Sequence, residues 1–108
     1  VKVITENDIV KNRISKAKDF LRNYKISKKK KNIYRHVGVY QYEASILKKF
    51  VKFRQTKKEL THKLEQLRAI ENGIEIDVVY SKNNSPGIDT VEDYVEIKKI
   101  MEYKIKKL

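Results

Sequence analysis

The sequence predicts an α/β or α+β fold built as one domain or as part of one. Residues 1–5 and 74–80 are rich in valine and isoleucine, which favour strands, while residues 44–53 and 56–72 space their apolar side chains as helices do. Strands interleaved with amphipathic helices indicate a layered sheet with helices against it. A length of 108 residues with 40% hydrophobic content is enough for one modest core.

The first half of the chain contains two predicted strands separated by a segment of uncertain type. Residues 1–5 form the first strand, but the apolar residues of the segment 9–21 fit neither helical nor strand spacing. Residues 33–42 favour a second strand, in which Gly38 marks a close backbone approach. Val39 lies in that strand and is predicted to belong to the core.

Two helices are predicted next. Residues 44–53 carry apolar residues on one face, and Thr56 with Glu59 has the spacing of a capping box that starts the second helix. Gly73 can supply the left-handed residue that ends it. Leu60, Leu64 and Leu67 repeat at helical spacing, and Leu64 and Leu67 are predicted to belong to the core.

A strand at residues 74–80 is followed by a loop and a last helix. Thr90 can cap that helix, with Asp93 at the reciprocal third position. Asp89 lies at the end of this βα loop, where carboxylates often serve metal or phosphate chemistry in α/β proteins. The apolar stripe of the helix is predicted to contain Tyr94, Ile97, Met101, Ile105 and Leu108.

The net charge of +12 raises the possibility of nucleic-acid binding, because basic side chains neutralise phosphates. Only five of the 26 basic residues are arginines, however. Lysine is a point charge and cannot make the bidentate contacts by which arginine binds phosphates and bases. Residues 28–31 are all lysine and predict a solvated loop. We therefore expect no nucleic-acid partner, and a basic nucleic-acid-binding domain stays an alternative.

The composition also indicates in which part of the cell the protein is expected. It has no cysteine, which excludes disulfides and thiolate metal sites, and no apolar run long enough to span a membrane. We expect a cytoplasmic protein with no membrane partner. No signal-peptide pattern precedes the apolar strand at residues 1–5, so we expect the chain to start in the middle of a fold.

Three motifs occur in order along the chain. They are Arg-His-Val-Gly-Val-Tyr-Gln-Tyr at 35–42, Leu-Glu-Gln-Leu-Arg at 64–68 with a glycine at 73, and Gly-Ile-Asp-Thr-Val-Glu-Asp at 87–93. This set resembles the C-terminal portion of the 3-deoxy-manno-octulosonate (KDO) cytidylyltransferases, the CMP-KDO synthetases. The resemblance implies the C-terminal part of a doubly wound nucleotidyltransferase fold of the nucleotide-diphospho-sugar transferase type.

The resemblance also implies an activity and its residues. The family transfers CMP from CTP to KDO for lipopolysaccharide biosynthesis with the help of Mg²⁺. His36 and Tyr40 match residues that contact the sugar acid, and Glu65 and Gln66 match helix positions in the same pocket. Ser15 matches a family serine, although the arginine that follows it there is Lys16 here. Asp89, in the third motif, matches the family aspartate that binds the metal ion.

Residues 1–108 would then be a single partial domain, the sugar-binding and dimerisation portion, without the N-terminal half that binds CTP. No catalytic residue is assigned within it, and we expect the chain alone to be inactive. The partners implied are CTP, KDO and a second copy in a homodimer. The alternative is a stand-alone dimerisation or interaction module, in which residues 1–5 would form an exposed sheet edge.

Overall fold

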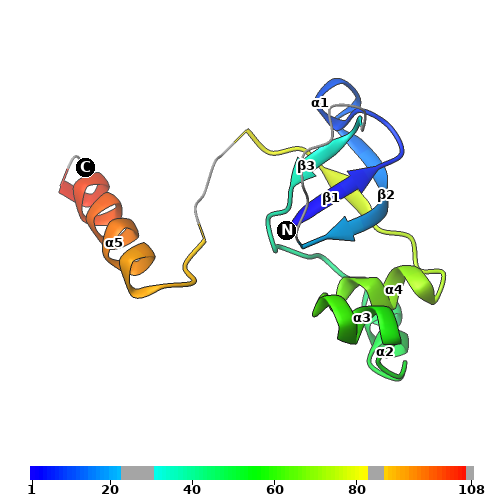
Figure 1. The fold of residues 1–108 in the computed structure, drawn as a ribbon. Coiled ribbons are helices and arrows are strands. Elements are labelled where there is room, and N and C mark those ends of the chain that lie inside the picture. The colour runs from blue at the N-terminus through cyan, green and yellow to red at the C-terminus, as the bar shows by residue number, and fades with distance from the viewer. Residues whose placement is uncertain (23–30, 83–86, 107–108) are drawn as a thin grey trace.

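A computed structural model describes residues 1–22, 31–82 and 87–106 of the chain. A curled sheet with three short helices beneath it forms the main body, and a longer helix lies apart from both (Figure 1). The elements in chain order are β1 (Lys2–Thr5), α1 (Ile9–Asn12), β2 (Ile14–Leu21), β3 (Ile33–Arg35), α2 (Ala44–Phe50), α3 (Lys57–His62), α4 (Gln66–Glu71), β4 (Asp77–Val79) and α5 (Val91–Lys106).

The four-stranded sheet has the order β3-β1-β2-β4, and each neighbouring pair is antiparallel. The mixture of strands and helices along the chain confirms the predicted α/β class. The doubly wound arrangement, which is built on parallel strands, stays a prediction. β1 lies between β2 and β3, so the prediction that residues 1–5 form a sheet edge is wrong. Both of its sides are covered because strands that follow it in the chain return to pair with it.

The uncertain segment 9–21 contains one turn of helix and the longest strand. Asp8 caps α1 by accepting hydrogen bonds from the backbone N–H groups of Val10 and Lys11. Arg13 ends the helix in the left-handed region, at a φ of 70°. The segment fits neither helical nor strand spacing as a whole, because a helix and a strand follow each other with only Arg13 between them.

β3 is shorter than predicted. It ends at Arg35, and residues 36–43 form no strand or helix, so the predicted strand is wrong beyond that point. Just after the last paired residue, the N–H of His36 donates to the carbonyl of Val1 at 3.0 Å. Val39 is 84% exposed, so its predicted place in the core is also wrong.

The helix predicted over residues 56–72 is two helices. The capping box of Thr56 and Glu59 is confirmed, but Lys63 adopts a left-handed conformation, with a φ of 53°, and separates α3 from α4. The break turns Leu64 and Leu67 inward and leaves Leu60 exposed. Gly73 has a φ of 77° just after α4, as predicted for the stop.

The core lies where α4 meets the sheet. Leu67 is completely buried there, and Val3, Phe20 and Leu64 complete the central cluster. Burying one such side chain contributes roughly 1.5–3 kcal/mol, so this cluster, which joins β1 and β2 to α4 and the residue Leu64 before it, stabilises the body. Partly buried side chains around the cluster are Ala17, Tyr34, Ile70, Ile76 and Val78.

α5 begins as predicted and lies apart from the core (Figure 1). The Thr90 hydroxyl accepts from the N–H of Asp93, and the Asp93 carboxylate accepts from the N–H groups of Thr90 and Asp89. No residue of Val91–Lys106 is buried, and Met101 of the predicted stripe is 58% exposed. Leu108 and the lysines at 28–30 lie outside the described residues.

None of the helices in the described ranges is long and apolar enough to cross a membrane.

Candidate functional site

The segment 36–42 leaves the edge of the sheet and carries a row of aromatic side chains. The His36 ring meets Phe20 of the core edge-on, with centroids 5.4 Å apart. His36 Nε2 and the Tyr40 hydroxyl oxygen are 2.7 Å apart, which is a hydrogen bond. The structure therefore brings His36 and Tyr40 together, and the half-buried histidine ties the segment to the core.

The aromatic row continues from Tyr40 to α2. The rings of Tyr40 and Tyr42 are 6.3 Å apart, and those of Tyr42 and Phe50 are 6.0 Å apart. The guanidinium carbon of Arg68 lies 4.8 Å from the centre of the Phe50 ring. These separations are typical of attractive aromatic and cation–π contacts. A continuous line of side chains thus runs from His36 to α4.

Glu65 and Gln66 lie at the start of α4, where the chain turns after α3. Arg22, just after β2, fixes this turn by donating from Nε to the His62 carbonyl at 3.0 Å and from Nη2 to the Lys63 carbonyl at 2.7 Å. Such contacts satisfy carbonyls left free at a helix end. Glu65 is exposed at this turn, whereas Gln66 is buried.

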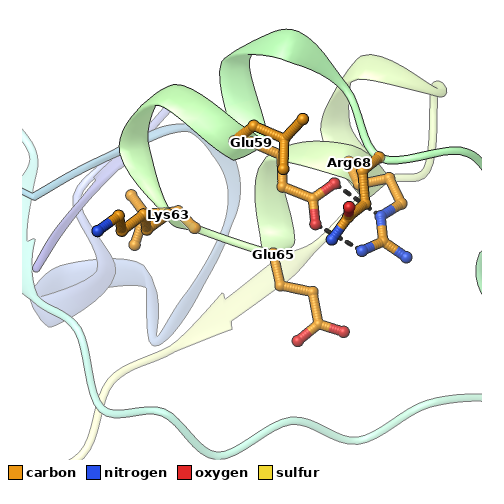
Figure 2. A pocket seen from close by; sticks show the side chains of 7 residues that line it. Glu59, Lys63, Glu65 and Arg68 are labelled. Atoms are coloured by element: carbon orange, nitrogen blue, oxygen red, sulfur yellow. Dashed lines mark hydrogen bonds and ion pairs between the residues drawn. The ribbon is translucent and has the colours of Figure 1, made fainter.

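A buried ion pair lies beside Glu65. Arg68 donates from Nε to Glu59 Oε1 at 2.8 Å and from Nη2 to the other carboxylate oxygen, so the pair is bidentate. The Arg68 and Glu59 side chains are 13% and 6% exposed, and the bonds between them lower the pKa of Glu59 and raise that of Arg68. Figure 2 shows the pair bridging α3 and α4, with Glu65 and Lys63 pointing away from it.

The pair forms one wall of an open hollow of about 580 Å³. Glu65 lines the hollow, whereas Gln66 does not. The lining therefore includes the paired charges of Glu59 and Arg68 together with the charged side chains of Lys63 and Glu65, for which no ion pair occurs among the described residues. Its lining residues are Gln55, Glu59, Leu60, Lys63, Leu64, Glu65 and Arg68.

Electrostatics link Glu65 to the aromatic row. Burial, together with smaller contributions from the Tyr42 and Glu65 side chains, raises the pKa of Tyr40 to about 12. Burial also raises the pKa of Tyr42, with Glu65 adding to the shift and Arg68 opposing it. Burial lowers the pKa of His36 from 6.5, so the ring is neutral at pH 7. A neutral histidine and protonated tyrosines can both donate and accept hydrogen bonds.

Ser15 lies away from this group. It is a buried residue near the start of β2, and its hydroxyl accepts from the backbone N–H of Asn7 at 2.8 Å. Phe20, which touches His36, is five residues further along the strand, or roughly 16 Å at the usual rise per residue. Lys16 pairs with Glu75 on the exposed surface at 2.9 Å. The structure does not bring Ser15 to His36 and Tyr40.

Asp89 lies in the loop before α5 and is exposed. Its carboxylate type suits Mg²⁺, which prefers oxygen ligands. No group of three or more His, Asp or Glu side chains able to hold a metal ion occurs within residues 1–22, 31–82 and 87–106. The neighbouring Asp93 carboxylate already accepts hydrogen bonds at the helix start. Asp89 is therefore one ligand at most, and the described residues do not complete a metal site.

Three residues of this region, Tyr42, Phe50 and Arg68, were not predicted to act at the site. Arg68 belongs to the Leu-Glu-Gln-Leu-Arg motif and Tyr42 ends the aromatic motif, so both were visible in the sequence. Their contact through Phe50 was not, because it joins α2, α4 and a segment without regular structure.

Comparison with known proteins identifies the family. The sequence profile described as Cytidylyltransferase matches residues 1–76, which include every predicted sugar-contact residue and exclude Asp89. Proteins named 3-deoxy-manno-octulosonate cytidylyltransferase are also similar to the chain. The one from Thermodesulfovibrio yellowstonii is 49% identical over 61 residues, which cover 56% of this chain and 24% of the relative.

Two further relatives with the same name give the same picture. The protein from Geobacter sulfurreducens is 47% identical over 64 residues, covering 59% of this chain and 26% of its own. The protein from Pelodictyon phaeoclathratiforme is 39% identical over 69 residues, which cover 64% of this chain and 28% of the relative. The chain thus spans about a quarter of the length of these relatives. Since the profile covers well over half of its residues, the chain belongs to the cytidylyltransferase family.

Proposed function

We propose that this chain is the sugar-binding portion of a nucleotidyltransferase that transfers CMP from CTP to KDO, with release of pyrophosphate, for lipopolysaccharide biosynthesis. Its family and the names of its relatives support this activity. The chain would correspond to a C-terminal part of a nucleotide-diphospho-sugar transferase-like fold. The CTP-binding half would come from the length that the relatives have in addition, so residues 1–108 alone would be inactive.

The observation that carries the proposal is the juxtaposition of His36, Tyr40 and Glu65. A sugar acid has one carboxylate and several hydroxyl groups, which need hydrogen-bond donors and acceptors fixed close together. His36 and Tyr40 are fixed by their mutual hydrogen bond, and Glu65 lies within electrostatic reach of Tyr40. We assign the donors to the histidine and tyrosine, which would bind the carboxylate, and the acceptor to Glu65, which would bind hydroxyls.

Gln66 and Ser15 have weaker support. Gln66 is buried next to Glu65 in the chain and does not line the hollow. The Ser15 hydroxyl already accepts from Asn7. Both stay predictions as substrate contacts.

Mg²⁺ remains a proposal based on Asp89. A carboxylate oxygen is a suitable ligand, and Mg²⁺ in such sites is commonly held by one or two carboxylates together with substrate phosphates. Asp89 would supply one ligand, and the ion when bound would balance the phosphate charge. A second carboxylate would come from the rest of the enzyme. A homodimer likewise stays a prediction, which light scattering would test.

A chimera tests the activity. Residues 1–108 would replace the aligned segment of the Geobacter sulfurreducens relative, and CMP-KDO formation from CTP and KDO would be measured. We expect turnover in the chimera and none in the isolated chain. A chimera that folds and binds CTP but makes no CMP-KDO would contradict the proposal.

Variants in the same chimera test the site. We expect Tyr40→Phe and Glu65→Gln to weaken KDO binding by about tenfold, the usual effect of a lost hydrogen bond to a charged partner. Tyr94→Phe is the matched control, because this tyrosine is exposed on α5. Equal effects of Tyr40→Phe and Tyr94→Phe would remove Tyr40 from the sugar site.

A further inference from the structure

We propose that Arg68, held by Glu59, is a positioning residue that fixes the His36–Tyr42 row of side chains relative to Glu65. The role of this pair in sugar binding rests on the proposed function, whereas its mechanical role does not. Arg68 links the two parts of the candidate site. Its backbone N–H donates to the Glu65 carbonyl at 3.0 Å, and its guanidinium lies over Phe50, whose ring meets that of Tyr42.

The segment 36–42 needs side-chain support because its backbone has little. It forms no strand, and the backbone hydrogen bonds described for it are one from His36 N–H to Val1 and one from Val39 N–H to Val37. Val39 is almost fully exposed and contributes no anchoring contact to the core. The placement of Tyr40 and Tyr42 therefore depends on their ring contacts.

Those ring contacts end at two anchors. At one end His36 meets Phe20, which belongs to the core cluster. At the other end Tyr42 meets Phe50, a buried residue of α2 covered by the Arg68 guanidinium. The first anchor is apolar and built into the sheet. The second depends on a cation whose orientation is set by two hydrogen bonds to Glu59.

Arginine suits this role and lysine does not. The planar guanidinium can bind both carboxylate oxygens of Glu59 while one face lies on an aromatic ring. An ammonium is a point charge that makes neither the fork nor the stack. Arg68 also interacts electrostatically with Glu65 and Tyr42, so its displacement would change both parts of the candidate site.

Arg68→Lys in the 108-residue chain tests the inference. The readout is the titration of the Tyr40 hydroxyl, obtained as the ultraviolet difference from the matching Tyr40→Phe protein, together with the NMR signals of the His36 ring. We expect the Tyr40 pKa to fall from about 12 toward 10.0, because the row loses its second anchor and Tyr40 becomes more exposed. Arg54→Lys, on the exposed surface, is the control and should leave both signals unchanged.

Phe50→Leu is the second variant, and it keeps the Glu59–Arg68 pair. It removes the ring between Arg68 and Tyr42, so the Tyr40 and His36 signals should change in the same direction. It also decides the question if Arg68→Lys fails to fold. Lower stability with unchanged Tyr40 and His36 signals in the folded variants would reduce the pair to a link between α3 and α4 and overturn the inference.

The sugar readout is kept separate. KDO is added to the wild-type chain and to Arg68→Lys, and the His36 ring signals are followed. A KDO response in the wild type that weakens at least tenfold in the variant supports both proposals. No response in the wild type, with the Tyr40 titration shifted in the variant, would contradict the sugar site and leave the positioning role intact.

Discussion

Residues 36–42 and residues 87–93 differ in what holds them, although each carries a proposed site residue and lies mainly outside helices and strands. The first is fixed by distant partners, since His36 meets Phe20 of β2 and Tyr42 meets Phe50 of α2. The second is fixed by neighbours in the sequence, since Asp93 accepts from the N–H groups of Asp89 and Thr90. Tertiary packing supports the sugar-contact candidates, and a helix cap supports the metal-ligand candidate.

This difference indicates how each region responds to change. Loss of core packing should disturb His36 and Tyr40 but not the start of α5. Loss of the helix cap should disturb Asp89 but not the body. Independent behaviour of this kind is expected because no residue of α5 is buried.

The largest effect is expected from Leu67→Ala. Leu67 is completely buried between α4 and the sheet, and its truncation should lower the free energy of unfolding by about 3 kcal/mol. Val39→Ala is the matched control and should change it by less than about 0.5 kcal/mol, because Val39 is 84% exposed. Denaturant unfolding measures both changes. Similar losses of unfolding free energy in the two variants would show that Val39 belongs to the core.

Acid should destabilise the body through Glu59. Hydrogen bonds from Arg68 lower the Glu59 pKa below its ordinary 4.5, so the folded state binds a proton less readily than the unfolded state. The stabilisation is complete above the ordinary value and is lost as the pH falls through the lowered pKa. Unfolding followed from pH 7 to pH 3 should show this loss, and Glu59→Gln should flatten the profile. An unchanged profile in Glu59→Gln would contradict the assignment.

Thr90→Ala should act on α5 alone. Removing a threonine cap costs about 1 kcal/mol of helix stability, so circular dichroism should show less helix. The unfolding midpoint of the body, followed by near-ultraviolet signals, should stay unchanged because no residue of α5 is buried. A shifted midpoint would show that α5 and the body are coupled.

The smallest effect is expected from Tyr40→Phe. The hydrogen bond to His36 is partly exposed, so its loss should lower the free energy of unfolding by about 0.5 kcal/mol.

NMR titration should place the His36 pKa below 6.5 in the wild type, because burial disfavours the charged ring. Protonating His36 should therefore destabilise the fold as the pH falls below that value. A wild-type pKa above 6.5 would contradict the described burial.

Local signals were predicted well from the sequence. The caps formed by Thr56 with Glu59 and by Thr90 with Asp93 are confirmed, because each depends on residues three apart. Strand character at residues 1–5 and 74–80 is confirmed with shorter bounds.

Features that depend on the tertiary arrangement were predicted poorly. Val39 lies in a segment with the composition of a strand, but β3 ends at Arg35 and Val39 is exposed. The break at Lys63 is held by Arg22, some forty residues earlier, so helical spacing alone could not locate it. Within the candidate site, the pairing of His36 with Tyr40 follows from a short motif, whereas the link through Phe50 to Arg68 does not.

The brevity of the outer strands has a consequence for solubility. β3 and β4 form the two margins of the sheet, and each has three residues, including the charged Arg35 and Asp77. A foreign strand approaching either margin would find few free backbone groups and a charge in its path, which natural proteins use against edge-to-edge aggregation. The margins of the sheet are therefore poor templates for the addition of a further strand.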